Sequence, residues 1–251
     1  MMLKIPLPKM PTPEQHRAYS EAWFRRLDGT NLDQLPATVL ALGPKTHFLD
    51  FDAHALRGMF DRDMAEADRL AKEADKITGW NQHFFKLSTR SAKDTYDNHG
   101  LTVSGKQALD WMSCSMRIMD DLCNLAWLEG YQAKLCIREP FYGADGLGTW
   151  EFRCFVKGGD LIAVTDYDYT KPNAALQDDE VRGRVCQQIR EFFAAKIGPE
   201  MSLSDYVFDL AYTHDGWVLI EVNPYGLSDP CFLKDYATVE AFTGNIAHAA
   251  E

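Results

Sequence analysis

The segment that decides the fold reads DYVFDLAYT over residues 205–213, HDG over 214–216 and WVLIEVNP over 217–224. Two runs rich in β-branched and aromatic residues, joined by a short polar segment that contains a glycine, predict a β-hairpin. A two-residue turn at Asp215-Gly216 would place acidic and apolar residues together on both faces of the hairpin. We therefore expect a three-residue loop from His214 to Gly216, with Gly216 in the left-handed conformation.

This register places Asp209 opposite Glu221 and Val207 opposite Asn223. One face of the hairpin is then apolar and consists of Phe208, Leu210, Tyr212, Val218, Ile220 and Val222. The other face gathers two carboxylates and an amide, and two carboxylates directly opposite each other repel unless a cation lies between them. Such hard oxygen donors suit Mg²⁺, which completes its coordination with water and nucleotide phosphates. The hairpin alone equally allows these polar residues simply to face water.

Composition excludes several classes of protein. The 251 residues are 46% apolar and 25% charged, which is typical of a globular chain with one substantial core or two small lobes. The 37 acidic residues outnumber the 26 basic residues, so we expect no nucleic-acid partner. No apolar run approaches the roughly 20 residues of a membrane-spanning helix, so we expect no membrane partner. Met1 to Pro11 lack the apolar core of a secretion signal, and six scattered cysteines are expected to be reduced thiols, so we expect a cytoplasmic protein.

The two halves of the chain differ in character. Helical patterns occupy the first half: one from Thr12 to about Asp28-Gly29, one over about 52–77, and one from Ser104 towards Trp127. The third pattern also allows a break near Cys114. After Gly130 short strand-like runs follow, with one helix at about 178–196; the runs cover 131–138, 150–156, 160–166, 205–213 and 217–222. This predicts an α+β fold with an antiparallel sheet and an N-terminal helical region. Because no linker or repeat is present, we expect a single two-lobed unit over 1–251, divided into about 1–133 and 134–251.

Several cations lie where a phosphate could bind. Lys86 ends a short apolar run, and the polar loop STRSAKD (88–94) that follows carries Arg90 and Lys93. Such a loop can cover an anion, although loops of this kind are more often only solvated. No glycine-rich phosphate-binding sequence of the Walker type is present. Arg153 interrupts an aromatic strand and Arg138 ends another, and each would need a carboxylate or a ligand phosphate as its partner.

These motifs, taken in order, resemble the cell division cycle protein 123 family, a divergent clade of the ATP-grasp enzymes. The resemblance runs from about 134 to 233 and rests on EFRCFV (151–156), LIA (161–163), DYT (168–170), YVFD (206–209) and LIEVNPYG (219–226). A weaker match lies in Lys86-Leu87 with Lys93-Asp94, and the first 80 residues match no family. In this comparison Tyr167 stands where the eukaryotic members carry an arginine, and Glu221 stands where they commonly carry an aspartate. The shorter chain favours a prokaryotic or viral relative.

The resemblance implies a two-lobed ATP-grasp fold that grips ATP between its lobes. It implies a Mg²⁺ ion held against the phosphates by Asp209, Glu221 and Asn223. It also implies that Lys86 and Lys93 lie at the phosphates and that Arg153 lies in the cleft. Lys86 and Arg153 are accordingly the candidate catalytic residues. Arg138 and Glu139 would lie on the hinge between the lobes, beside the adenine.

Two functions are consistent with these features. An ATP-dependent ligase would activate a carboxylate as an acyl phosphate for attack by an amine or another nucleophile, with Mg²⁺ and the cations neutralising the transferring phosphoryl group. An ATP-binding assembly factor would instead use the nucleotide to brace a surface for a protein partner, without turnover. We favour the ligase because the metal ligands are complete. The expected partners are ATP and either an unidentified carboxylate or amine substrate or a protein.

Overall fold

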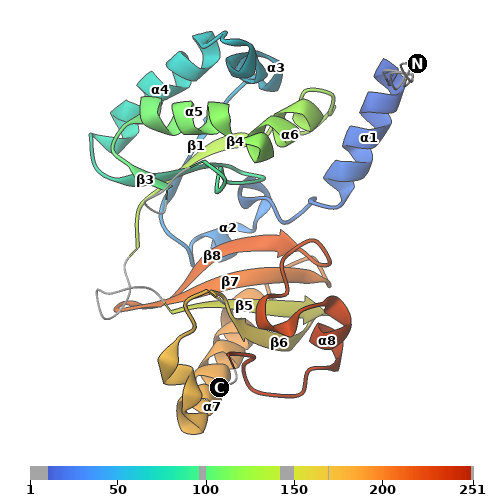
Figure 1. Ribbon diagram of the computed structural model, residues 1–251, viewed down its shortest axis with the longest axis vertical. Coiled ribbons are helices and arrows are strands. Elements are labelled where there is room, and N and C mark those ends of the chain that lie inside the picture. Colours follow the sequence, from blue (N-terminus) through green and yellow to red (C-terminus); the bar gives the residue numbers. More distant parts are fainter. Residues whose placement is uncertain (1–10, 96–99, 142–149, 169, 250–251) are drawn as a thin grey trace, which may run out of the picture.

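Two four-stranded antiparallel sheets organise the chain, and Figure 1 shows them one above the other with helices on the outside of each. The computed structural model describes residues 11–95, 100–141, 150–168 and 170–249. Tyr169, which belongs to the motif at 168–170, lies outside the described residues. The predicted α+β class is confirmed, because an N-terminal helical region adjoins antiparallel sheets.

The upper sheet combines strands from distant parts of the chain, in the order β1-β4-β2-β3. Its strands are β1 (Thr46–Asp50), β4 (Lys134–Arg138), β2 (His83–Leu87) and β3 (Leu101–Thr102). β4 lies between β1 and β2. Backbone pairing thus holds β4, which the division expected at 133/134 assigns to the second lobe, in the same sheet as strands of the first half. The division itself stays a prediction.

The helices above this sheet begin where side chains cap them. α1 (Pro13–Arg25) starts with the expected capping box of Thr12 and Gln15, and α5 (Gly105–Cys114) starts at Ser104. α6 (Met116–Leu125) is separate from α5 because Ser115 is extended and accepts a hydrogen bond from the backbone of Ile118. A buried apolar cluster joins these helices to the sheet and includes Leu70, Leu109, Met112, Leu122, Leu87 and Leu135.

One helix prediction is wrong. The stretch expected as a single helix over 52–77 consists of α3 (Ala53–Arg57), a 3₁₀ turn (Gly58–Asp61) and α4 (Ala65–Thr78). The break occurs at Arg62, whose φ of 68° is left-handed and ends the preceding turn. Apolar spacing continues through such a break, so periodicity alone does not reveal it.

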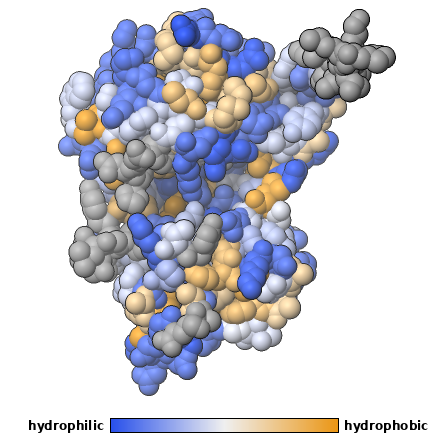
Figure 2. Space-filling model, in the orientation of Figure 1, coloured by the Kyte–Doolittle hydropathy of each residue, from blue (hydrophilic) through white to orange (hydrophobic). Residues whose placement is uncertain are grey.

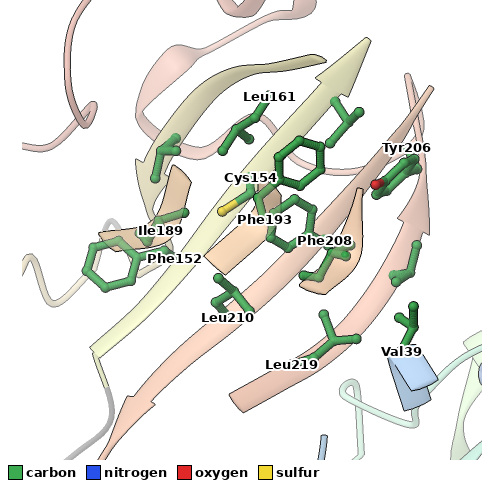
Figure 3. Packing of buried hydrophobic residues seen from close by; sticks show 14 of the residues in the cluster. Val39, Phe152, Cys154, Leu161, Ile189, Phe193, Tyr206, Phe208, Leu210 and Leu219 are labelled. Atoms are coloured by element: carbon green, nitrogen blue, oxygen red, sulfur yellow. The ribbon is translucent and has the colours of Figure 1, made fainter. Parts of the chain in front are cut away.

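The lower sheet has the order β6-β5-β7-β8. Its strands are β5 (Trp150–Lys157), β6 (Asp160–Asp166), β7 (Tyr206–Thr213) and β8 (Gly216–Pro224). α7 (Asp179–Phe192), which continues as a π-helical turn (Phe193–Ile197), packs on one face of the sheet, and Figure 3 shows its Ile189 and the adjoining Phe193 against Phe152, Cys154, Phe208 and Leu210. α8 (Tyr236–Ala241) packs with Phe155 and Val207 on the opposite face. Short helical segments complete the fold: Leu32–Gln34, α2 (Ala37–Leu40), Ala174–Gln177 and Cys231–Leu233.

The hairpin of β7 and β8 has the expected pairing of Asp209 with Glu221 and of Val207 with Asn223, but it reaches this pairing by another route. The turn is shorter than expected, because Thr213 pairs with Gly216, and the register shifts between Asp209 and Leu210. That shift leaves Ile220 as an extra residue in β8, which is a β-bulge.

Because of the bulge, the apolar face of β8 differs from the predicted one. Leu210 pairs with Leu219 and Tyr212 pairs with Trp217, so Leu219 and Trp217 pack into the core where Ile220 and Val218 were expected. Gly216 has the expected positive φ, at 108°. The structure therefore keeps the acidic pair of the prediction and changes its supporting geometry.

Candidate functional site

The site begins with an ion pair between neighbouring strands. Arg153 on β5 pairs with Asp209 on β7, and its guanidinium donates two hydrogen bonds to that carboxylate, Nε to Oδ1 at 2.9 Å and Nη2 to Oδ2 at 2.8 Å. Arg153 Nη1 also donates to the carbonyl oxygen of Asp229 at 2.9 Å. Such a bidentate pair fixes the orientation of both side chains.

Glu221 lies beside Asp209 and is paired with one cation of β2 and one cation of the loop that follows β2. Lys86 Nζ donates to Glu221 Oε2 at 2.9 Å, although 135 positions separate the two residues in sequence. Lys93 Nζ lies 3.7 Å from Glu221 Oε1. Burial by itself would raise the pKa of Glu221, but the charges of Lys86 and Lys93 outweigh burial and hold that pKa well below its ordinary value. Glu221 is therefore ionised, and its ion pairs join β8 of the lower sheet to the upper part of the molecule.

Arg153, Asp209, Glu221, Lys86 and Lys93 form a charged cluster. Tyr167 completes this cluster, although it is not among the predicted site residues. Its hydroxyl oxygen accepts a hydrogen bond from Lys93 Nζ at 3.1 Å, and its ring lies 4.8 Å from the Arg153 guanidinium. The pKa of Lys93 is raised, chiefly by Glu221, and burial raises the pKa of Tyr167, so the lysine is charged and the phenol is neutral. The one sequence signal for Tyr167 is its position where related chains carry an arginine.

Asn223 lies next to this acidic pair. Its Nδ2 lies 3.4 Å from Asp209 Oδ2. Two carboxylates and an amide oxygen form a set of hard donors that fits Mg²⁺ by chemistry. Among the described residues, no group of three or more His, Cys, Asp and Glu side chains is arranged to hold a metal ion. The assignment of Mg²⁺ to Asp209, Glu221 and Asn223 therefore stays a prediction.

The two hinge residues have different surroundings. Arg138 ends β4 and is buried, and its Nη1 donates to the carbonyl oxygen of Ile220 in β8 at 2.6 Å. It thus joins the upper sheet to the edge strand of the lower sheet. The Glu139 carboxylate instead pairs with the exposed Lys45 at 3.2 Å. Their expected roles beside an adenine stay predictions.

The loop over 88–94 is anchored to α6 rather than free to close over an anion. Asp94 accepts a hydrogen bond from Ser115 Oγ at 2.6 Å, and Thr89 Oγ1 donates to Asp121 Oδ2 at 2.7 Å. Arg90 Nη2 lies 3.1 Å from Asp121 Oδ1, an ion pair without hydrogen-bond geometry. Of the two cations in this loop, only Lys93 reaches the charged cluster.

Figure 2 shows a hollow between the upper and lower halves of the molecule, bordered by hydrophilic residues in blue. Two further hollows, of about 390 and 240 Å³, lie on the α7 side of the lower sheet and share Gln188, Tyr212 and Trp217. Neither of these two hollows is lined by a residue of the charged cluster. We place the candidate site at the charged cluster because buried ionisable side chains from distant parts of the chain converge there, which is typical of functional sites.

Comparisons with known proteins identify relatives of this chain. Residues 129–246 match the model of the D123 family, which confirms the expected resemblance over that part of the chain. A translation initiation factor eIF2 assembly protein from Xenopus tropicalis is 37% identical over 79 residues, which make up 30% of this chain and 22% of that relative. The corresponding protein from Danio rerio is 36% identical over 77 residues, with the same coverage. The chain thus matches less than a quarter of the length of these curated relatives.

Solved structures extend the likeness to most of the chain. The structure of Cdc123 from Schizosaccharomyces pombe has a TM-score of 0.69 at 18% identity and covers 88% of this chain and 96% of that chain. A RimK domain ATP-grasp protein from Sphaerobacter thermophilus has a TM-score of 0.35 at 17% identity and covers 81% of this chain and 58% of that one. The likeness to Cdc123 shows that this chain has the fold of that protein, as the resemblance predicts. In the described part of the chain, no helix is long and apolar enough to cross a membrane.

Proposed function

Because residues 129–246 of this chain belong to the D123 family, we propose that it is an ATP-binding assembly factor for a protein complex. The family match covers the strands that carry Arg153, Asp209 and Glu221, and the curated relatives are themselves described as assembly proteins. This support favours the assembly factor over the ligase. Its protein partner is unidentified, and the translation factor named for the relatives is one candidate.

The charged cluster contains cations and oxygen donors of the kind that bind a nucleoside triphosphate and its metal ion. Lys86, Lys93 and Arg153 are cations that converge from both sheets, and they can donate hydrogen bonds to phosphate oxygens. Asp209, Glu221 and Asn223 would hold Mg²⁺, which neutralises phosphate charge when bound. Since Lys86 and Arg138 already connect the upper sheet to β8, a ligand at this position would brace the two sheets against each other.

Nucleotide binding is tested by calorimetry with Mg·ATP. Lys93 suits this test because 43% of its side chain is exposed, so Lys93→Gln leaves little buried charge unpaired. We expect Lys93→Gln to weaken Mg·ATP binding about tenfold, the effect of losing one charge-assisted contact. Lys72→Gln, on the exposed surface of α4, is the matched control and should bind like the wild type. Equal affinities of the two variants would remove the phosphate assignment.

Assembly and ligase activity are separated by two further measurements. If the protein is an assembly factor, the wild type should capture its partner from an extract in the presence of Mg·ATP. The Lys93→Gln variant should capture less of that partner. It should release no ADP and phosphate in response to a panel of amino acids, peptides and extracts. Phosphate release that depends on one acceptor, with a new bond in that acceptor detected by mass spectrometry, would instead establish the ligase.

A further inference from the structure

Three aromatic rings form a wall on the face of the lower sheet that α7 covers. They belong to Trp150 on β5, Tyr212 on β7 and Trp217 on β8. The ring centroids of Tyr212 and Trp217 are 4.9 Å apart, and those of Trp150 and Tyr212 are 6.4 Å apart. Trp217 also packs edge-on against Phe152 of the core, with centroids 5.8 Å apart. All three rings of the wall are only partly buried, so an apolar surface that is fixed to the core stays open.

The two hollows on the α7 side of the lower sheet lie between this wall and one face of α7. They have volumes of about 390 and 240 Å³ and share Gln188, Tyr212 and Trp217. The lining residues of α7 recur at helical spacing: Val181, Arg184, Val185, Gln188, Glu191 and Phe192. From Arg184 in the smaller hollow to Glu191 in the larger one, the helix rises about 10 Å. We call the two adjoining hollows the α7 groove.

Polar side chains of the α7 groove are available to a ligand. In the described part of the chain, no hydrogen bond or ion pair engages the Arg184 guanidinium, the Gln188 amide or the Tyr212 hydroxyl. The Glu191 carboxylate, in contrast, accepts a hydrogen bond from Gln187 Nε2 at 2.7 Å. Arg184 is thus an unpaired cation beside an apolar wall, on a chain whose formal net charge is −11. A carboxylate is the ligand group that complements it.

The composition and shape of the α7 groove favour a peptide as the ligand. Trp, Tyr and Arg are the residue types that most often dominate the binding energy at protein–protein interfaces, and all three line the smaller hollow. An extended peptide places every second side chain on the same side, about 7 Å apart, which suits two hollows with a common border. The Gln188 amide and the Tyr212 hydroxyl can both donate to and accept from the peptide backbone.

We propose that the α7 groove binds an extended acidic segment of a partner protein. Two apolar side chains, two positions apart in that segment, occupy the two hollows, and a neighbouring carboxylate pairs with Arg184. The proposal goes beyond nucleotide binding and does not depend on it, because no residue of the charged cluster lines either hollow. A partner held in this groove leaves the charged cluster open to its own ligand.

The charge preference is tested with two peptides that carry fluorescein at the N-terminus and an amide at the C-terminus. One has the sequence Asp-Phe-Ser-Leu and the other Lys-Phe-Ser-Leu, and each is also made in the reverse order. By fluorescence anisotropy, the wild type should bind the acidic peptide, in one of its two orders, at least about tenfold more tightly than the basic one. Arg184→Glu should reverse this preference. Lys72→Glu, the same change of charge on the exposed surface of α4, should keep it.

The location is tested by filling the common border of the two hollows. Gln188 is exposed, so Gln188→Trp should fold normally, and it should weaken binding of the acidic peptide at least about tenfold. The matched control is Gln187→Trp, since Gln187 is an exposed neighbour that lines neither hollow. This control should bind the peptide like the wild type.

Four results would overturn the proposal. A wild type that binds neither peptide would show that the α7 groove is not a peptide site. A wild type that favours the basic peptide, or an Arg184→Glu variant that still favours the acidic one, would contradict the pairing of a carboxylate with Arg184. Equal binding by Gln188→Trp and Gln187→Trp would place the peptide elsewhere on the molecule.

Discussion

The guanidinium of Arg138, at the end of β4, donates a hydrogen bond of 2.6 Å to the carbonyl oxygen of Ile220, the bulged residue of β8. The bulge leaves this carbonyl outside the ladder of β7 and β8, so it is available to a donor from the other sheet. The neighbouring Leu219 N–H donates to the carbonyl oxygen of Leu42 at 2.9 Å. The outer edge of β8 is therefore where the upper part of the molecule attaches to the lower sheet.

Gly43 lies against this attachment, and we expect Gly43→Ala to weaken it. A Cβ at this position would lie 2.5 Å from the carbonyl oxygen of Leu219 and 3.0 Å from Arg138 Nη2. Because the nearest atom belongs to the backbone, the contact must open, and we expect unfolding in urea to show a loss of about 2 kcal/mol. Gly183→Ala in α7, where the nearest atom is 3.7 Å away, should not be destabilising. Equal stability of the two variants would contradict the role of Gly43.

Arg153 and Asp209 should be strongly coupled in stability. Removing either partner alone leaves a buried charge, so Asp209→Ala and Arg153→Met should each cost about 3–5 kcal/mol in the free energy of unfolding. Their combination should cost clearly less than the sum of the two single changes, because no buried charge then remains. A double-mutant cycle in urea measures this coupling. Additive costs would show that the pair is not the reason for either loss.

Tyr167→Phe should weaken Mg·ATP binding by about three- to tenfold while leaving the fold intact. The variant keeps the ring beside Arg153 but loses the hydroxyl oxygen that orients Lys93. Tyr212→Phe is the control, because Tyr212 lies on the opposite face of the same sheet, against Trp217. Calorimetry measures both variants. An unchanged affinity for Tyr167→Phe would mean that Glu221 alone positions Lys93.

Asp121 should make stability depend on pH. Burial raises its pKa from the ordinary value of 3.8 to about 6, even though Arg90 and Thr89 oppose the shift. The folded state thus binds this proton more tightly than the unfolded state does, so the stabilisation is full below pH 4 and is lost as pH rises through 6.

The control for this prediction is Asp121→Asn, which cannot titrate. The difference in unfolding free energy between wild type and Asp121→Asn should shift against the wild type by about 2 kcal/mol between pH 4 and pH 7. Urea unfolding at a series of pH values measures it. A difference that stays constant with pH would show that Asp121 keeps an ordinary pKa in the folded protein.

Local patterns were enough to predict most of the elements. The capping residues Thr12 and Ser104 mark helix starts because their side chains bond to the backbone within the same turn. The alternation in β7 and β8 predicts that Asp209 and Glu221 share a face, because a strand places successive side chains on opposite faces. The break at Arg62 escaped prediction, since it depends on backbone conformation and not on the spacing of apolar residues.

By itself, the sequence determined that the first half of the chain is mainly helical and the second half mainly strands. It also determined the antiparallel hairpin and the acidic pair that the hairpin carries. All of these follow from residues near one another in the chain. Only the tertiary structure decided which cations meet those acids. Lys86 and Lys93 reach Glu221, whereas Arg90 in the same loop turns to Asp121. The packing of one sheet against the other, and of the loop against α6, determines which cation pairs with which carboxylate. Ion pairs between residues more than a hundred positions apart, such as Lys86 and Glu221, produce no periodic pattern in a sequence.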